Sequence, residues 1–279
     1  MNEGAGGVAL PGFDADTAVR ALGEGRFAAT MSERWWVGRG PNGGYVAAVI
    51  LRAILAAAAT GAERAPRSLT VHYQRAPQAG PVEIAVAVER TGRRVSFLSA
   101  RMTQAGKVQA TAMAVLSEDW AEGGFEELAM PDAGAPGELH ATDFEARPGA
   151  PTMLQNYLLR PALGEPAFSG GASYTGAWIR TREPHLLDAP LAAAFLDTWF
   201  PAPFVRLDGP RPAPTIDYTV HFRSPLPPPG ASAEDPYLVA FRSGTARHGF
   251  FEEDGELWSA DGTLLAQSRQ LALLLDPGA

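Results

Sequence analysis

A glycine-rich segment, Gly38 to Gly44, separates a strand-like stretch from a long apolar run. It contains the spacing GxGxxG, which is typical of a dinucleotide-binding turn. Such a fold needs further alternating strands and helices, and none follow here, so we disfavour it. Glycines at this place can end the strand tightly and leave the first N–H groups of the next helix open to a carbonyl oxygen or an anion. They fit equally well a role in letting the helix pass close to a sheet.

One carboxylate, Asp197, stands near the end of a second apolar segment, where we expect a helix over Leu191–Phe200. An unpaired charge is costly to bury, so this side chain must find hydrogen-bond partners or shift its pKa. A carboxylate with a raised pKa can take a proton from water at neutral pH, as a general base does. The pattern alone also fits an ordinary acid at a helix end.

Other kinds of chemistry find no support in the sequence. The chain has no cysteine, which excludes disulfides and thiolate chemistry. The nucleophile motif GxSxG is absent, because the nearest string, Gly171–Gly176, has the wrong spacing. No group of His, Asp and Glu has the spacing of metal ligands, and we expect neither a metal nor an organic cofactor.

Composition limits the partners. A net charge of −8 disfavours nucleic acid binding, which relies on Lys and Arg. No apolar stretch reaches the roughly 18 residues that a membrane-spanning helix needs. The N-terminus lacks the basic region of a signal peptide. We therefore expect a cytoplasmic protein that binds neither nucleic acid nor membrane.

One short sequence occurs twice. Thr70–Tyr73 is followed by an Arg and a Pro, and so is its counterpart Thr219–Phe222, 149 residues downstream. A period near half the chain length predicts two similar domains packed as a pseudo-dimer, since one unit alone leaves an apolar face uncovered. We place the domains at residues 1–117 and 152–279, joined by a linker over 118–151 that is rich in Gly and Pro.

Each copy predicts an apolar helix followed by antiparallel strands, which is an α+β pattern. We expect helices at Asp14–Leu22, Tyr45–Ala59 and Pro190–Phe200, and the second is apolar almost all round and therefore buried. Alternation of apolar and polar residues predicts strands, among them Leu69–Arg75 and Pro214–Arg223.

Longer motifs carry a family resemblance. They are GRFAATMSERWWVGRGPNGGY at Gly25–Tyr45, AWIR at Ala177–Arg180, FLDTWFPAP at Phe195–Pro203, PTIDYTVHFR at Pro214–Arg223 and DGTLLAQSRQLAL at Asp261–Leu273. Over nearly its whole length the chain resembles the acyl-CoA thioesterase II group and the related thioesterase-like proteins. The resemblance implies a tandem (double) hotdog fold, with an antiparallel sheet wrapped around a central helix in each half. It also implies hydrolysis of an acyl-CoA thioester to free acid and CoA.

The family's catalytic set is an Asp on the second helix, a Thr or Ser at the start of the next strand, and a Gln on the last strand. The matching positions here are Asp197, Thr215 and Gln270. The resemblance implies that Asp197 is the base, while Thr215 and Gln270 orient the water and polarise the carbonyl. Two departures, Tyr218 where His is common and Leu271 after Gln270, leave the acyl group undefined.

Strand alternation bears on which glutamine of the last strand reaches the site. Gln267 and Gln270 are three residues apart, so they point to opposite faces of a regular strand. Leu271 and Leu273 share the parity of Gln267, which predicts Gln270 on the face away from the core unless a bulge or the interface between the halves changes this. The motif match favours Gln270, and we keep it in the catalytic set.

Aromatic residues gather near both expected helices: Trp35, Trp36, Tyr45, Trp199 and Phe200. They fit the apolar wall of an acyl tunnel, and they fit equally the core of the pseudo-dimer. With the thioester carbonyl expected at the first N–H groups of the helix, we take Gly43, Gly44, Tyr45 and Trp199 as substrate-binding residues.

Two other functions stay open. His185 lies in EPHLLD at Glu183–Asp188, which loosely resembles the Asn-Pro-Ile-His-x-Asp stretch of hotdog enoyl-CoA hydratases, although its His–Asp spacing is off by one. The other is a non-catalytic acyl-binding protein that keeps the fold. The first-half counterpart of Gln270 falls near Met113, so we expect one active site per chain. We expect acyl-CoA as the partner and a homo-oligomer, with a dimer of pseudo-dimers as one form.

Overall fold

The structure is a computed structural model that describes residues 12–58, 64–120, 123–141 and 150–276. Its first-half elements are α1 (Gly12–Thr17), β1 (Arg20–Gly23), β2 (Arg26–Met31), η1 (Glu33–Trp35), β3 (Trp36–Val37), β4 (Gly40–Pro41), α2 (Gly43–Ala58), β5 (Ala65–Tyr73), β6 (Gly80–Thr91), β7 (Val95–Gln104) and β8 (Lys107–Ser117). The second-half elements are β9 (His140–Ala141), η2 (Thr152–Asn156), β10 (Tyr157–Gly164), β11 (Tyr174–Thr181), α3 (Ala189–Phe195), η3 (Ala202–Val205), β12 (Thr215–Phe222), β13 (Tyr237–Arg242), β14 (Ala246–Arg247), β15 (Phe250–Ser259) and β16 (Leu264–Leu273).

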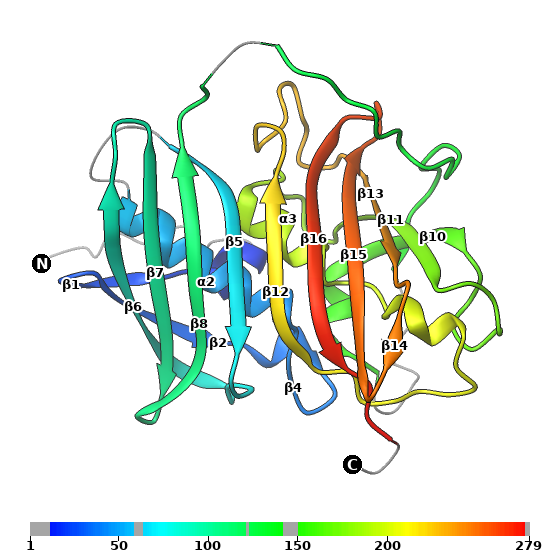
Figure 1. Cartoon of the computed structure of the whole chain (residues 1–279), viewed down its shortest axis with the longest axis horizontal. Helices are drawn as coiled ribbons and strands as arrows, with labels where there is room; N and C mark the ends of the chain where they lie inside the picture. Colours follow the sequence, from blue (N-terminus) through cyan, green and yellow to red (C-terminus); the bar gives the residue numbers. More distant parts are fainter. Residues whose placement is uncertain (1–11, 59–63, 121–122, 142–149, 277–279) are drawn as a thin grey trace, which may run out of the picture.

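Within the described residues, the main sheet has 14 strands, and its order is β1-β2-β6-β7-β8-β5-β12-β16-β15-β13-β11-β10-β9, with β14 beside β15. Figure 1 shows α2 and α3 behind this sheet, one in each half. Helix α2 is apolar, as its sequence predicts, and is buried along most of its length. It packs against both α3 and the inner face of the sheet. The expected tandem α+β arrangement is confirmed. None of the described helices is long and apolar enough to cross a membrane.

The two copies of the repeated strand pair with each other. Strands β5 and β12 are antiparallel neighbours, and Thr70 lies opposite its counterpart Thr219. The two hydroxyl oxygens are 3.0 Å apart. Equivalent residues face each other in this way where a two-fold axis passes between them, so a pseudo-two-fold axis relates the halves. Both strands also have a register irregularity at the equivalent point, just after Pro66 in β5 and just after Thr215 in β12.

Part of the segment between the halves packs onto the sheet. Met130, Ala133 and Leu139 contact an apolar cluster on one face of β11, β13 and β15. Neighbouring residues of β11, such as Ala177 and Trp178, belong to separate clusters, so these strands are buried on both faces. In Figure 1 the described residues 123–141 of this segment run along the second half. The domain limits at residues 117 and 152 remain a prediction.

Two expected helices end earlier than their sequences predict. The helix expected over Asp14–Leu22 is α1, which ends at Thr17, and β1 follows it. The Thr17 hydroxyl donates to the Phe13 carbonyl at 2.7 Å, a local bond that competes with helix continuation. The helix expected over Pro190–Phe200 is α3, which ends at Phe195. Asp197 therefore lies beyond the helix.

Candidate active site

The turn that follows α3 places Asp197. Two main-chain N–H groups, those of Asp197 and Thr198, donate to the carbonyls three residues before them at 3.2 Å. The Thr198 hydroxyl donates to the Ala194 carbonyl at 2.7 Å. Bonds of this spacing tighten the last turn to 3₁₀ geometry and end the helix, which hydrophobic periodicity alone cannot reveal.

The N-terminus of α2 holds the Asp197 carboxylate. Asn42 caps this helix, because its Oδ1 accepts the Tyr45 N–H at 2.9 Å. The Asn42 amide nitrogen donates to Asp197 twice, to Oδ2 at 2.9 Å and to the main-chain carbonyl at 2.7 Å. The Gly44 N–H donates to the same Oδ2 at 2.7 Å. The positive end of the helix dipole adds to this stabilisation of negative charge.

Two glycines allow α2 to approach the end of α3 this closely. A Cβ on Gly44 would lie 2.9 Å from the Ala193 carbonyl oxygen and from Cβ of Asp197. A Cβ on Gly43 would lie 3.0 Å from Oδ2 of Asp197. Because the Gly44 N–H already binds the carboxylate, its expected bond to a substrate carbonyl stays a prediction and needs that hydrogen bond to be shared or exchanged.

The pKa of Asp197 is shifted toward neutrality. Burial raises the pKa of Asp197 to about 6, and hydrogen bonding by Gly44, Asn42, Gln270 and Gly43 offsets part of this effect. Asp197 is nevertheless only partly buried when the whole residue is considered. At neutral pH the carboxylate is therefore mostly ionised, and it is more basic than an ordinary Asp.

Of the other two sequence-predicted catalytic residues, Gln270 interacts with this carboxylate and Thr215 contacts Gln270. The Thr215 hydroxyl, at the start of β12, donates to Oε1 of Gln270 in β16 at 2.7 Å, and Gln270 also lowers the pKa of Asp197. The alternation argument placed Gln270 on the wrong face, because Gln270 is 6% exposed whereas Leu271 is 36% exposed. The outer face of the strand carries the leucine, so leucine parity does not mark the core side here.

Two residues of the site were missed from the sequence, Asn42 and Glu253. Glu253 lies in β15 and is 4% exposed. One of its oxygens accepts a hydrogen bond from Nε2 of Gln270 at 2.9 Å, and the other accepts one from the Ala202 N–H. Burial raises the pKa of Glu253 to about 8. A capping signal before the apolar helix could have found Asn42, whereas Glu253 is hidden in the acidic run Glu252–Asp254.

The remaining predicted substrate contacts differ in their surroundings. Tyr45 is fully buried and stacks on Trp35 with ring centroids 5.3 Å apart. Its hydroxyl donates to the Asp16 carbonyl at 2.7 Å, so this placement makes it a core residue and does not favour contact with substrate. Trp199 is partly buried, and its indole N–H donates to Thr175 at 2.8 Å. Its contact with substrate stays a prediction.

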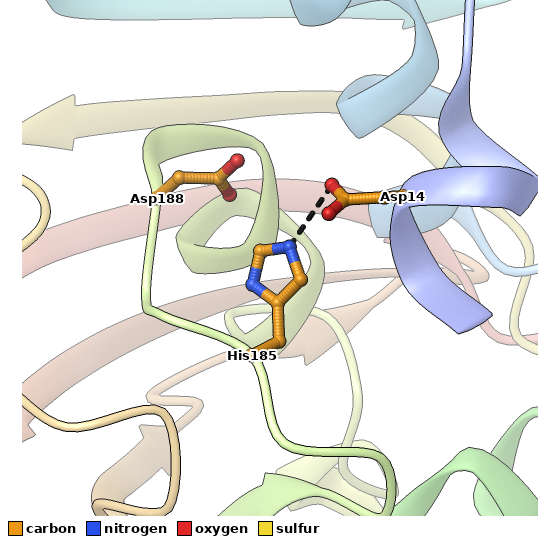
Figure 2. A group of neighbouring side chains, drawn as sticks. All are labelled: Asp14, His185 and Asp188. Atoms are coloured by element: carbon orange, nitrogen blue, oxygen red, sulfur yellow. Dashed lines mark hydrogen bonds and ion pairs between the residues drawn. The ribbon is translucent and has the colours of Figure 1, made fainter. Parts of the chain in front are cut away.

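A second polar cluster lies at the other end of α3. Figure 2 shows His185 directed toward Asp14, with Asp188 beside them. Nε2 of His185 lies 3.0 Å from Asp14, and ligand atoms of all three residues lie within 4.8 Å of one another. The guanidinium of Arg52 forms ion pairs with both carboxylates and lies 3.2 Å from Asp188. Its positive charge disfavours binding of a metal cation by these three residues. Asp188 also caps α3 through the Leu191 N–H. These contacts make the cluster a structural tie between α1, α2 and α3.

Solved structures share the whole fold. A hotdog-fold protein of unknown function from Alicyclobacillus acidocaldarius superposes with a TM-score of 0.82 at 30% identity, covering 95% of this chain and 98% of that one. An acyl-CoA thioesterase II from Mycobacterium marinum superposes with a TM-score of 0.74 at 20% identity, covering 96% and 99%. The chain is therefore a tandem hotdog protein, as the sequence motifs imply.

Family models refine this class. The model of the acyl-CoA thioesterase N-terminal domain matches residues 31–117, and that of the acyl-CoA thioesterase C-terminal domain matches residues 131–274. No match was found among curated protein sequences. The two models cover both halves of the pseudo-dimer, and the chain belongs to the acyl-CoA thioesterase family.

Proposed function

We propose that the chain hydrolyses an acyl-CoA thioester to a free acid and CoA, with Asp197 as the general base. One observation supports this most strongly. A carboxylate with a pKa near 6 meets the hydrogen-bonded pair Thr215 and Gln270 at the N-terminus of a buried helix. The combination provides a proton acceptor beside groups that can hold one water.

In the proposed reaction, a water oriented by Thr215 and Gln270 attacks the thioester carbonyl carbon while Asp197 accepts one of its protons. Negative charge then develops on the carbonyl oxygen, and the N–H groups of Gly43 and Gly44, which bind Asp197 in this structure, are the donors proposed to be shared with it. As the intermediate collapses, the C–S bond breaks and CoA leaves as a thiolate. The proton held by Asp197 returns to solvent or to the thiolate, which restores the base. No metal or organic cofactor takes part in this scheme.

The proposal also includes the number of active sites, the location and the assembly of the protein. We infer one active site per chain, a cytoplasmic location and assembly into a homo-oligomer. The composition supports the location, since a chain without cysteine suits a reducing compartment. The oligomer is testable directly by light scattering.

A panel of acyl-CoAs tests the activity. The panel runs from short to long saturated chains and includes an enoyl-CoA, with thiol release followed by a chromogenic reagent and the acyl group followed by mass spectrometry. We expect catalytic release of free CoA and free acid from a subset of chain lengths. Hydration of the enoyl chain without thiol release identifies a hydratase instead, and saturable binding without turnover identifies an acyl-binding protein. Either of these results overturns the proposal.

A further inference from the structure

Glu253 is a buried carboxylate that the proposed reaction does not use. It lies directly opposite Gln270 in the pairing of β15 with β16. Both of its oxygens accept N–H groups, one from the Gln270 amide at 2.9 Å and one from the Ala202 main chain. An ionised carboxylate can only accept hydrogen bonds, so a glutamine beside it must present its nitrogen.

This constraint fixes the other end of the Gln270 amide. With the nitrogen toward Glu253, the oxygen faces Thr215, whose hydroxyl donates to it at 2.7 Å. A hydroxyl has one proton, so Thr215 then offers only lone pairs to a neighbouring water. With the amide turned round, its nitrogen would donate to Thr215, and the hydroxyl proton would point at the water instead.

Building on the proposed function, we propose that Glu253 is a positioning residue, which holds the Gln270 amide so that Thr215 accepts a hydrogen bond from one O–H of the attacking water and leaves the other O–H to face Asp197. Glu253 acts only through neighbours in this scheme. Its second bond, to Ala202, ties it to the segment that follows Asp197. One side chain thus couples the β16 amide to the turn that carries the base.

Ionisation of Glu253 makes this role dependent on pH. The pKa of Glu253 is raised to about 8: burial is the main cause, the donors on Ala202 and Gln270 offset part of it, and the charges of Asp197 and Glu252 add to it. Tyr218 in β12 also interacts electrostatically with Glu253. A protonated Glu253 can donate to the amide oxygen and turn the amide. We therefore expect a second rise in kcat as the pH passes through about 8.

The variant Glu253→Gln tests this directly. The Ala202 N–H still needs an acceptor, so the new side chain turns its oxygen there and its NH2 group toward Gln270, which inverts the Gln270 amide. At pH 9, where Glu253 of the wild type is ionised, we expect kcat to fall roughly 10- to 100-fold with KM within about twofold, since small errors in positioning are costly. The rise near pH 8 should also disappear. Glu252→Gln, on the adjacent residue, is the control: losing its charge lowers the pKa of Glu253, so the rise in kcat should move to lower pH, while kcat at pH 9 should stay unchanged.

Stability separates positioning from a structural role. The folded-state pKa of Glu253 lies above its ordinary value, so the wild type loses stability as pH rises from about 4.5 to 8. Glu253→Gln should lose less stability over this range, although its activity is lower. In a Gln270→Ala background, Glu253→Gln should add no further loss of kcat. A folded Glu253→Gln protein with wild-type kcat and pH profile would overturn the inference.

A second measurement does not depend on turnover. The side-chain amide resonances of Gln270, assigned with Gln270→Ala, should titrate near pH 8 in the wild type and at lower pH in Glu252→Gln, and the titration should vanish in Glu253→Gln. Resonances that stay unmoved overturn the role of Glu253, whatever the activity. A wild type that hydrolyses no acyl-CoA, with Gln270 resonances that respond as expected, overturns only the proposed function.

Discussion

The two halves of the molecule share one strand arrangement and differ in the side chains at equivalent positions. Tyr218 in β12 corresponds to Leu69 in β5, by the same 149-residue offset that relates the paired threonines. Gln270 lies opposite Tyr218, and Ala114 lies opposite Leu69. The first-half counterpart of Gln270 is therefore Ala114, one residue from the Met113 that the sequence offset suggests.

The remaining polar residues of the site follow the same pattern. Glu253 lies opposite Gln270 in the second half, and its counterpart opposite Ala114 is Leu98. Thr215 corresponds to Pro66, which has no hydroxyl, and α2 carries no acidic residue. The first half keeps an apolar set that packs, and the second half keeps a polar set that can do chemistry. Duplication of the fold has thus retained the backbone symmetry and confined the polar groups to one side.

The largest effect on kcat should follow from removing the charge of Asp197, the carboxylate that the second half contributes to the site. Asp197→Asn keeps an oxygen to accept the Gly44 N–H, but it cannot take a proton from water. We expect kcat to fall about 10²- to 10⁴-fold, the usual contribution of a general base, with the folded state preserved. CoA release and circular dichroism measure the two properties. A rate within threefold of wild type would show that the base is elsewhere.

Close approach of α2 to α3 should matter next. Gly44→Ala places a Cβ against the Ala193 carbonyl and Asp197, so the carboxylate must move. We expect a loss of about 1–3 kcal/mol in the free energy of unfolding, as for other overpacked sites, with lower kcat. Gly209→Ala is the control, because a Cβ there meets open space. If denaturant titration gave the two variants the same free energy of unfolding, the close contact at Gly44 would be refuted.

Placing the polar residue in the apolar half should cost stability and leave activity intact. Ala114→Gln buries an amide opposite Leu98, where no acidic or hydroxyl counterpart exists. We expect about 1–3 kcal/mol of destabilisation from the unpaired polar group. Gln270→Ala should show the converse, a loss of kcat with a smaller change in stability. If both variants affected activity equally, the halves would not differ in function as described.

The smallest effect is expected at the pseudo-two-fold axis itself. Thr70→Val removes the hydrogen bond to Thr219 while keeping the side-chain shape. A hydrogen bond of this kind contributes about 1 kcal/mol, so urea unfolding should detect a loss of that order, with kcat unchanged. A large change in kcat would mean that the axis and the active site are coupled.

The sequence revealed what depends on local signals and missed what depends on distant contacts. The buried helix, the repeat and the glycine-rich segment follow from composition and periodicity. Asn42 and Asp197 are 155 residues apart, and no local pattern pairs them. Glu253 looks like one more exposed acid until β15 is placed beside β16. Leu271 misled the reading of the last strand, because the buried positions of β16 carry Ser268, Gln270 and Ala272, whereas the leucine lies on the exposed face.

The most direct test of a base held by the α2 N-terminus is the pH dependence of kcat/KM in the wild type and in Asn42→Asp. Aspartate caps a helix as well as asparagine does, but it replaces a donor to Asp197 with a second carboxylate, which raises the pKa of Asp197. We predict that wild-type kcat/KM falls as pH drops below about 6, and that this limb moves upward by about one pH unit or more in Asn42→Asp. A limb at the same pH in both proteins, or no limb near pH 6, would contradict the account.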